Sequence, residues 1–259
     1  ISTQSLAHAA EDIDLFACLG ANPYFSEFPS RHSVHVASVA IAMAIEMELP
    51  ERPIIDLAIG CLIHDLGMLA LPQAPHEQQR ELSDEEFVEI AKHPVLTVEM
   101  FANYLASLPF PSLLVAYQMH ERPNGSGYPR GRTSDEIHAL AKIAAVADAY
   151  TALVSPRPHR PGLQPYHAVR FLLKNVSEGL YDPAVVRALL RTISLFPLGS
   201  FVALQDDLVG KVIRSNPDKY DRPVVEIWQR TDLKAKPRIL DLSRSEVQIQ
   251  RTLAQLPQS

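Results

Sequence analysis

The sequence predicts an all-α helical bundle followed by a small, β-rich C-terminal extension. Apolar residues repeat with helical periodicity up to about Phe196, and short β-branched runs broken by Gly, Asn, Asp and Pro follow. His and Asp residues also recur at intervals close to the length of one helix and its connection. We expect three parts: a helical lead-in (1–30), a helical domain (31–196) and the extension (197–259).

The expected helices are bounded by prolines and by one capping sequence. Ser83-Asp84-Glu85-Glu86 has the form of a capping box, in which Ser83 is the N-cap and Glu86 reaches back to it. Pro94 either bends the helix that starts there or begins a new one. The expected helices are Ser33 to Leu49, Pro53 to Leu66, Ser83 to His93, 110 to 121, 135 to 154, 165 to 177 and 183 to 194.

The end of the chain and two internal loops differ from this helical pattern. Short strands are expected at 201–204, 208–213 and 222–228, and this extension is predicted to be a structural cap or a docking surface. The loops 122–133 and 155–164 are rich in proline and glycine. Loops of this size inside a compact domain tend to be functional.

Composition limits the class of protein. A formal net charge of −6 argues against a protein that coats a nucleic acid polymer, since phosphate neutralisation needs a basic surface. No stretch approaches the roughly 20 apolar residues of a membrane span. Cys18 and Cys61 form no paired motif, which favours a soluble protein in a reducing cytoplasm. The chain starts at Ile1 without a recognisable signal peptide, so we expect a segment of a longer cytoplasmic protein.

A set of imidazoles and carboxylates forms a candidate metal site. Asp65 closes an apolar run and Asp148 lies inside another, where an unpaired carboxylate is costly to bury. Each Asp could instead cap a helix or pair with an Arg, and a single His is more often a hydrogen-bonded core residue than a ligand. Taken together the set favours divalent metal. The candidate ligands are His32, His64, Asp65, His93, His120 and Asp148.

Four motifs carry a resemblance to a known family. They are Leu62-Ile63-His64-Asp65-Leu66-Gly67, Ile90-Ala91-Lys92-His93-Pro94, the stretch from His120 to Pro129, and Ala147-Asp148-Ala149-Tyr150-Thr151-Ala152-Leu153. In this order they resemble the HD-GYP subgroup of the HD phosphohydrolase superfamily, over about residues 30 to 200. The resemblance implies an all-α HD-domain bundle that acts as a metal-dependent phosphodiesterase on cyclic di-GMP and yields pGpG or GMP.

The resemblance also implies residue roles. The family's ligand set falls on the six candidates above, with His64 and Asp65 as the catalytic pair and Asp65 bridging two cations. Arg157 and Arg160 match a basic pair that faces phosphate. The Gly127-Tyr128-Pro129 loop would shape the rim of the substrate cleft, and in the family such loops are implicated in contacts with diguanylate cyclase domains. Fe, Mn, Ni, Mg and Zn are not distinguished by this ligand set.

The sequence departs from the family pattern at four positions. Met68 replaces a Lys that contacts the substrate phosphate, and Met119 replaces the first of two consecutive histidines. Thr151 stands where an Asp is frequent, and Phe28 replaces a Glu that occurs in members with three metals. We therefore expect one or two cations per chain. A thioether is a poor ligand for hard divalent ions, so Met119 does not compensate.

Two classes of function remain open at this stage. The first is an active cyclic di-GMP phosphodiesterase, favoured by the retention of both buried carboxylates. The second is a degenerate HD-GYP module that binds a nucleotide or a cyclase partner without turnover, favoured by the loss of the Lys at Met68. A hydrolase of other nucleotides is disfavoured by the intact Gly127-Tyr128-Pro129 loop.

Overall fold

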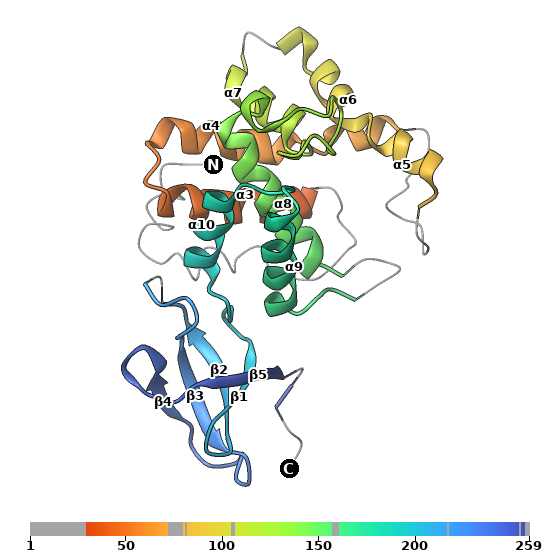
Figure 1. Cartoon of the computed structure of the whole chain (residues 1–259). Coiled ribbons are helices and arrows are strands. Elements are labelled where there is room, and N and C mark those ends of the chain that lie inside the picture. Colours follow the sequence, from red (N-terminus) through yellow and green to blue (C-terminus); the bar gives the residue numbers. More distant parts are fainter. Residues whose placement is uncertain are drawn as a thin grey trace.

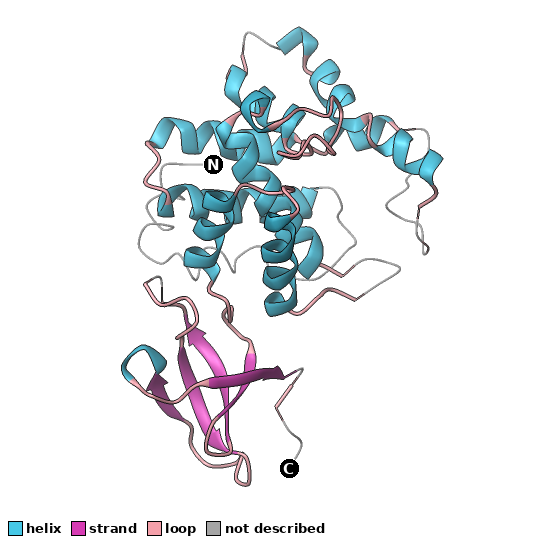
Figure 2. Ribbon diagram, viewed as in Figure 1, coloured by secondary structure: helices cyan, strands magenta, loops and turns pink. Residues whose placement is uncertain are grey.

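The computed structural model shows a mostly helical part followed by a five-stranded antiparallel sheet (Figures 1 and 2). The helices lie together in the upper part of Figure 1, and the sheet lies below them, reached through a short connection after α10. The structure describes residues 30–71, 80, 82–104, 107–156, 161–216, 218–253 and 255–256. Of the expected lead-in (1–30), residues 1–29 lie outside these residues, and Ser30 is the first residue of α3.

The helices follow the sequence prediction closely. Prolines open α6, α7, α9 and α10, and the predicted capping box opens α5 with both of its hydrogen bonds formed. Pro94 begins a new helix, because α6 starts at His93 after a two-residue turn. The α-helices are α3 (Ser30–Glu46), α4 (Glu51–Ile63), α5 (Asp84–Ile90), α6 (His93–Met100), α7 (Phe110–Gln118), α8 (Ala139–Val154), α9 (Pro165–Ser177) and α10 (Pro183–Ile193).

Several predicted helix ends were wrong by two to four residues, and three of them belong to the segments that carry His64, His120 and Asp148. The helix expected to run to Leu66 ends at Ile63, and the chain continues as a 3-10 turn, η2 (Leu66–Ala70). Helix α7 stops at Gln118, so His120 lies in the turn beyond it. Helix α8 starts at Ala139 because the side chain of His138 caps it. Helical periodicity continues through such turns, so the pattern alone does not locate these ends.

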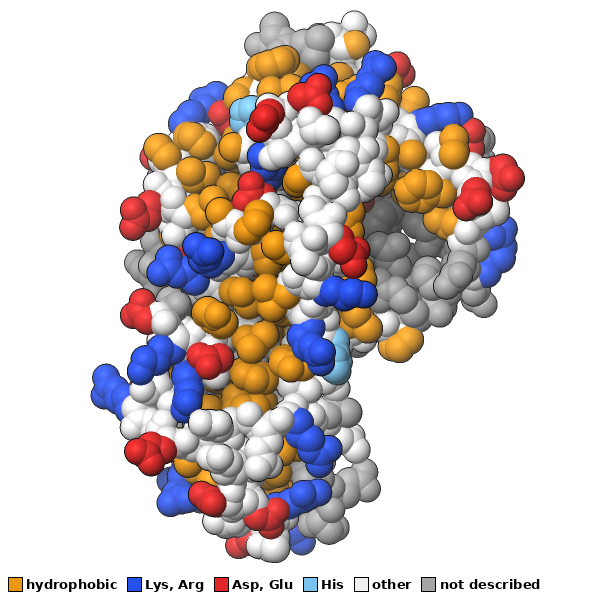
Figure 3. All heavy atoms as spheres, viewed as in Figure 1, with side chains coloured by type: hydrophobic (Ala, Val, Ile, Leu, Met, Phe, Trp, Pro, Cys, Tyr) orange, Lys and Arg blue, Asp and Glu red, His pale blue; other side chains and the backbone are white. Residues whose placement is uncertain are grey.

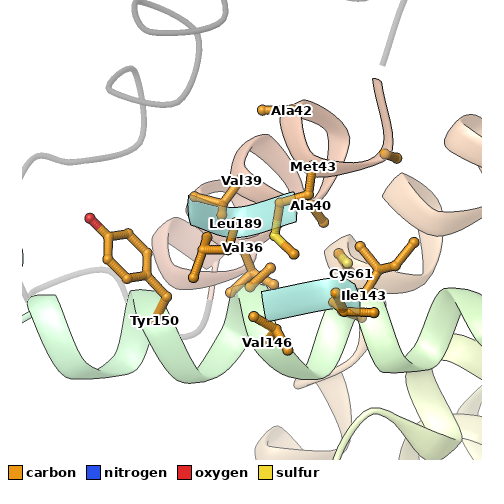
Figure 4. Packing of buried hydrophobic residues seen from close by; sticks show 14 of the residues in the cluster. Val36, Val39, Ala40, Ala42, Met43, Cys61, Ile143, Val146, Tyr150 and Leu189 are labelled. Carbon is orange, nitrogen blue, oxygen red and sulfur yellow. The ribbon is translucent and has the colours of Figure 1, made fainter. Parts of the chain in front are cut away.

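The core of the helical part is formed by helices that are apolar around most of their circumference. Side chains of α3, α4 and α8 meet there, including Val36, Cys61 and Ile143, and Leu189 of α10 packs on them (Figure 4). The segment Glu51–Ala70 is long and apolar enough to cross a membrane by composition, but 56% of its most apolar window is buried inside the protein. That burial is typical of a central core helix.

The C-terminal sheet has the strand order β4-β3-β2-β1-β5, and every neighbouring pair is antiparallel. Three strands were predicted, and the sheet has two more, β4 and β5, whose residues alternate too little to be recognised. The strands are β1 (Phe201–Leu204), β2 (Leu208–Arg214), β3 (Val224–Gln229), β4 (Arg238–Asp241) and β5 (Ile249–Leu253).

The sheet has its own apolar cluster, joined to the helices by one aromatic contact. Val202, Leu204 and Val225 are buried in this cluster, together with Phe196 from the connection after α10. The Phe196 ring stacks on Tyr166 of α9, with centroids 5.3 Å apart and an interplanar angle of 8°. The candidate ligands all belong to the helical part, so the sheet supplies none of them.

Candidate metal centre

The six predicted ligands converge on one buried cluster. His32 comes from the first turn of α3, His93 is the first residue of α6, and Asp148 lies in the middle of α8. His64 and Asp65 occupy the turn after α4, and His120 occupies the turn after α7. Most of these residues therefore sit where a helix begins or ends, and the bundle brings those ends together. All but His32, which is half-buried, are buried.

The Asp65 carboxylate lies between two imidazoles. Its Oδ1 is 3.2 Å from Nε2 of His64 and 3.4 Å from Nε2 of His93. The other ring nitrogen of each histidine is already used, because His64 Nδ1 donates to the Cys61 carbonyl at 2.7 Å and His93 Nδ1 donates to the Ile90 carbonyl at 2.8 Å. A donating Nδ1 leaves the neutral ring with its lone pair on Nε2. Both lone pairs therefore face the same carboxylate oxygen.

The second carboxylate of the cluster lies opposite, on α8. Asp148 Oδ1 is 2.9 Å from His32 Nε2, and Asp148 Oδ2 is 3.8 Å from His120 Nδ1. The Nε2 atoms of His93 and His120 are 3.0 Å apart. Since His93 Nε2 carries a lone pair, His120 donates from its Nε2 and keeps its own lone pair on Nδ1.

The protonation equilibria reflect this mixture of buried carboxylates and imidazoles. Burial lowers the pKa of His120 to about 3, helped by the neighbouring His93, and burial also lowers the pKa of His93. Burial disfavours charge on His64 as well, but the Asp65 carboxylate outweighs it and raises the pKa of His64 to about 9. The surrounding imidazoles hold the pKa of both Asp65 and Asp148 well below the usual range, although burial alone would raise it.

These features fit a bound divalent cation. His64 Nε2 is fully buried, makes no hydrogen bond, and faces a carboxylate oxygen, an arrangement that needs a proton or a cation between the two atoms. Neutral imidazoles oriented by carbonyl acceptors and ionised carboxylates are the ligands that such metals take in proteins. In each of two groups of residues, the three possible ligand atoms all lie within 4.8 Å of one another. The groups are His32-His64-Asp148 and His64-Asp65-His120.

Close packing fixes the turn that carries His64 and Asp65 against α6. Thr97 Oγ1 donates to the His64 carbonyl at 2.8 Å and accepts from the Gly67 backbone N–H at 2.9 Å. A Cβ at position 67 would overlap the His93 carbonyl oxygen, so the approach requires glycine. Thr97 was not predicted from the sequence, although its position one helical turn after His93 places both residues on the same face of α6.

The loop 122–133 is tied to the turn that carries His120 through Glu121. The Glu121 side chain is 1% exposed, and its two oxygens accept the backbone N–H groups of Arg130 and Arg132 at 2.8 and 2.9 Å. A Cβ on Gly127 would overlap the backbone of Glu121 and Arg122, so this loop passes too close for any other residue. No signal in the sequence indicates this role of Glu121. Its side chain binds backbone N–H groups, which every residue except proline has, so no particular partner residue type identifies it.

The loop places Tyr128 directly on the cluster. Its ring lies parallel to the His120 imidazole, with centroids 5.0 Å apart and an interplanar angle of 11°, and it meets His93 at 6.0 Å. The predicted rim residue thus covers two candidate ligands. Gly127 and Pro129 flank it and are both half-buried.

Three of the four positions that depart from the family pattern are buried, and the fourth, Phe28, lies outside the described residues. Met68 is 7% exposed, and Met119 is fully buried in the apolar core of the helical part. Thr151 is also buried, and its hydroxyl has no hydrogen-bond partner among the described residues. None of the three side chains therefore replaces the missing Lys, His or Asp in charge or coordination.

The predicted phosphate-binding pair, Arg157 and Arg160, lies outside the described residues. In the other loop, Arg122 donates to the carbonyls of Met119 and Glu121, and its guanidinium lies 5.2 Å from the Tyr181 ring centroid. These contacts give Arg122 a structural role at the loop base.

The chain matches the family model described as HD domain over residues 23–185. It is 30% identical over 223 residues to "Cyclic di-GMP phosphodiesterase PA4108" from Pseudomonas aeruginosa, covering 85% of this chain and 53% of the relative. It is also 30% identical over 173 residues to "3'3'-cGAMP-specific phosphodiesterase 3" from Vibrio cholerae, covering 66% of this chain and 37% of the relative.

A solved structure supports the same fold. The protein Bd1817 from Bdellovibrio bacteriovorus, described as an HDG"Y"P protein, aligns with a TM-score of 0.61 and 19% identity over 71% of this chain and 58% of that protein. The chain spans about half the length of the first of these curated relatives. The family model covers well over half of the chain and includes all six candidate ligands. The chain therefore belongs to the HD domain family, and its matches are of the HD-GYP type that its motifs resemble.

Proposed function

We propose that this chain is a metal-dependent phosphodiesterase that hydrolyses cyclic di-GMP to pGpG or GMP, with residues 31–196 as the phosphohydrolase domain. One observation carries the proposal: the Nε2 atoms of two oriented imidazoles, His64 and His93, face a single buried carboxylate oxygen of Asp65 at 3.2 and 3.4 Å. The similarity to curated phosphodiesterases supports the substrate class.

The ligand geometry suggests how the donors divide between cations. His64 has one free nitrogen, since Nδ1 is held by the Cys61 carbonyl, so it serves one cation only. The two candidate donor groups both contain His64 and cannot both be complete at once. We infer that His32, His64 and Asp148 hold one cation, that His93 and His120 hold a second, and that Asp65 contributes to both. When bound, such cations neutralise charge on the scissile phosphate and activate a water for in-line attack.

The protein's own groups prepare this site. The low pKa values of Asp65 and Asp148 keep both carboxylates ionised, and the low pKa values of His93 and His120 keep these rings neutral near pH 7. These four groups need no proton release before they coordinate, whereas His64, whose pKa is raised to about 9, must release a proton first. The stacked Tyr128 ring covers His120 and restricts its rotation.

Substrate contacts are proposed for the rim and for the second loop. Gly127, Tyr128 and Pro129 border the cluster, and the ring of Tyr128 excludes water from one side of it. Arg157 and Arg160 are proposed to bind the substrate phosphates, since the forked guanidinium group suits that role. The same Gly127-Tyr128-Pro129 loop is the proposed contact for a diguanylate cyclase domain.

A second candidate function is binding of a cyclic dinucleotide without turnover. Met68 favours this binding function, because its buried, uncharged side chain stands where the family has a Lys. The loss of the imidazole at Met119, which lies in the apolar core, favours it as well.

Turnover by metal-reconstituted protein separates these functions. Cyclic di-GMP and 3'3'-cGAMP would be incubated with the chain loaded with Fe, Mn, Ni, Mg or Zn, and products resolved by chromatography. Formation of pGpG or GMP that disappears with a chelator supports hydrolysis. Binding of cyclic di-GMP by calorimetry with no product under any of the five metals would contradict the enzyme and support the binding module.

A further inference from the structure

The exposed aromatic ring of Phe87 is the feature that the proposed site leaves unexplained. Phe87 lies on α5, a helix with no buried residue, and its side chain is 50% exposed. Hydrophobic and acidic side chains lie side by side on the right of Figure 3, where α5 lies in Figure 1. A single exposed apolar residue is ordinary. Phe87 differs because it contacts a residue of the site.

The Phe87 ring continues a series of aromatic contacts that starts at the candidate ligands. Its centroid is 5.7 Å from that of Tyr128, and the two planes are perpendicular at 89°. Tyr128 in turn stacks on His120 at 5.0 Å. One ring therefore separates Phe87 from a residue proposed to hold a cation.

The helix that carries Phe87 is stabilised by local bonds at its N-terminus, although it has no buried residue. Ser83 and Glu86 form its capping box, and Arg80 makes a two-pronged ion pair with Glu86 at 2.8 and 2.7 Å. Charge-assisted bonds of this kind fix geometry as well as adding energy. The helix is therefore formed at Phe87, and the edge contact with Tyr128 places the ring beside the site.

The charges around Phe87 determine which part of a nucleotide can contact its ring. Asp84, Glu85 and Glu86 fill the first turn of α5, and, with Glu86 paired to Arg80, the negative charge of Asp84 and Glu85 disfavours phosphate there. A purine base is neutral, is joined to its phosphate through a ribose, and presents a flat face that stacks on aromatic side chains. The base of a nucleotide whose phosphate is held at the cluster can therefore reach Phe87 while the phosphate stays away from the acidic turn.

We propose that Phe87 is a stacking contact for a purine base of the substrate, with Tyr128 supporting its ring. The inference rests on the proposed function, because it takes the phosphate to bind at the His and Asp cluster. Stacking contacts discriminate weakly between bases. Phe87 therefore contributes affinity for cyclic dinucleotides in general, and other residues choose between guanine and adenine.

The test compares two ligands that differ by the base. GMP and ribose 5-phosphate would be titrated calorimetrically into the metal-loaded full chain and into three variants. Phe87→Leu keeps apolar bulk and removes the ring, Phe87→Trp enlarges the stacking surface, and Val88→Ala is the matched control, since Val88 is 59% exposed on the same helix.

The expected result is a loss specific to the base. Phe87→Leu should bind GMP roughly tenfold to a hundredfold more weakly, in line with the effect of removing one stacking side chain. Its affinity for ribose 5-phosphate and its metal content should not change. Phe87→Trp should retain or improve GMP binding, and Val88→Ala should match the parent chain.

Two outcomes would overturn the proposal. One is equal GMP affinity in Phe87→Leu and the parent, and the other is an equal loss for both ligands, which would show that Phe87 only supports Tyr128. Failure of the proposed function would give a different result. If Phe87→Leu lost affinity for GMP alone while the chain never hydrolysed cyclic di-GMP, stacking would be supported and the enzyme contradicted.

Discussion

Tyr128 lies flat on His120, and the two residues are also joined through their backbones. The rings are 5.0 Å apart at 11°, and the Tyr128 N–H donates to the His120 carbonyl at 3.2 Å. The loop that leaves the cluster after His120 thus returns to it eight residues later. Through this contact the loop conformation controls how the His120 ring is oriented.

Glu121 should control metal affinity without touching the metal. Glu121→Ala removes two charge-assisted bonds to backbone N–H groups, each worth roughly 1.5 to 3 kcal/mol, and leaves both donors near the cluster without acceptors. We expect weaker metal binding, measured by metal titration, and lower thermal stability, measured by differential scanning calorimetry. Glu136→Ala is the control, because Glu136 also accepts a backbone N–H, from Thr133, but on the surface. Equal effects of the two substitutions would contradict the role of Glu121.

Asp65 should be required for metal binding and dispensable for folding. Asp65→Ala removes the oxygen that faces His64 and His93, so the chain should lose metal and any hydrolysis while its helicity stays nearly intact. Elemental analysis and circular dichroism measure the two effects. Asp56→Ala is the matched control, since Asp56 is another buried carboxylate on α4 but pairs with Arg52. Full metal content in Asp65→Ala would show that the assignment is wrong.

At most two cations should bind per chain, and the second should bind more weakly. Met119 offers no imidazole where the family has one, and Phe28 no carboxylate. Met119→His should tighten the second site, although a buried imidazole should destabilise the metal-free chain. Met119→Leu controls for the change in packing. Elemental analysis that finds three tightly bound metals in the unmodified chain, or no gain with Met119→His, would refute the ligand assignment.

Arg157 and Arg160 should bind phosphate and not metal. Replacing both with Ala removes two guanidinium groups, each worth roughly 1.5 to 3 kcal/mol when it bonds to a charged partner, so affinity for cyclic di-GMP should fall. Metal content should stay the same. Arg187→Ala, on the exposed face of α10, serves as control. Unchanged nucleotide affinity in the double variant would show that Arg157 and Arg160 are solvated loop residues that do not bind phosphate.

His35 should make the fold less stable in acid. Burial, with a smaller effect of nearby His32, lowers the pKa of His35 to about 4 from an ordinary value of 6.5. Below pH 6.5 the unfolded chain takes up a proton that the folded chain excludes. The free energy of unfolding should therefore fall by up to about 1.4 kcal/mol per pH unit from this residue, until about pH 4.

Replacing His35 with Leu isolates that contribution from the other histidines. Denaturant unfolding of the metal-free chain at several pH values should give a shallower dependence for His35→Leu than for the parent between pH 6.5 and 4. Identical slopes would show that His35 takes up its proton in the folded state as readily as in the unfolded one.

The sequence by itself determined the helices, the first three strands and the identity of the six candidate ligands. Helical periodicity, the Ser83 capping box and the helix-opening prolines are local properties, and each follows from neighbouring residues. Strand β4 was missed because its four residues alternate too little, and β5 was missed because its partner, β1, lies far earlier in the chain. Strand pairing of this kind is decided by tertiary context.

Only the tertiary structure decided how the ligands face one another. The sequence places His64 beside Asp65, but the lone pair on His64 Nε2 follows from a bond to the Cys61 carbonyl, and the approach of His93 follows from the contact of Thr97 with Gly67. Glu121 anchors the loop that carries Tyr128, and Phe87 contacts the Tyr128 ring from α5. Both proposed roles depend on these tertiary contacts. Orientation, burial and tautomer depend on packing between segments far apart in the chain, so no local pattern encodes them.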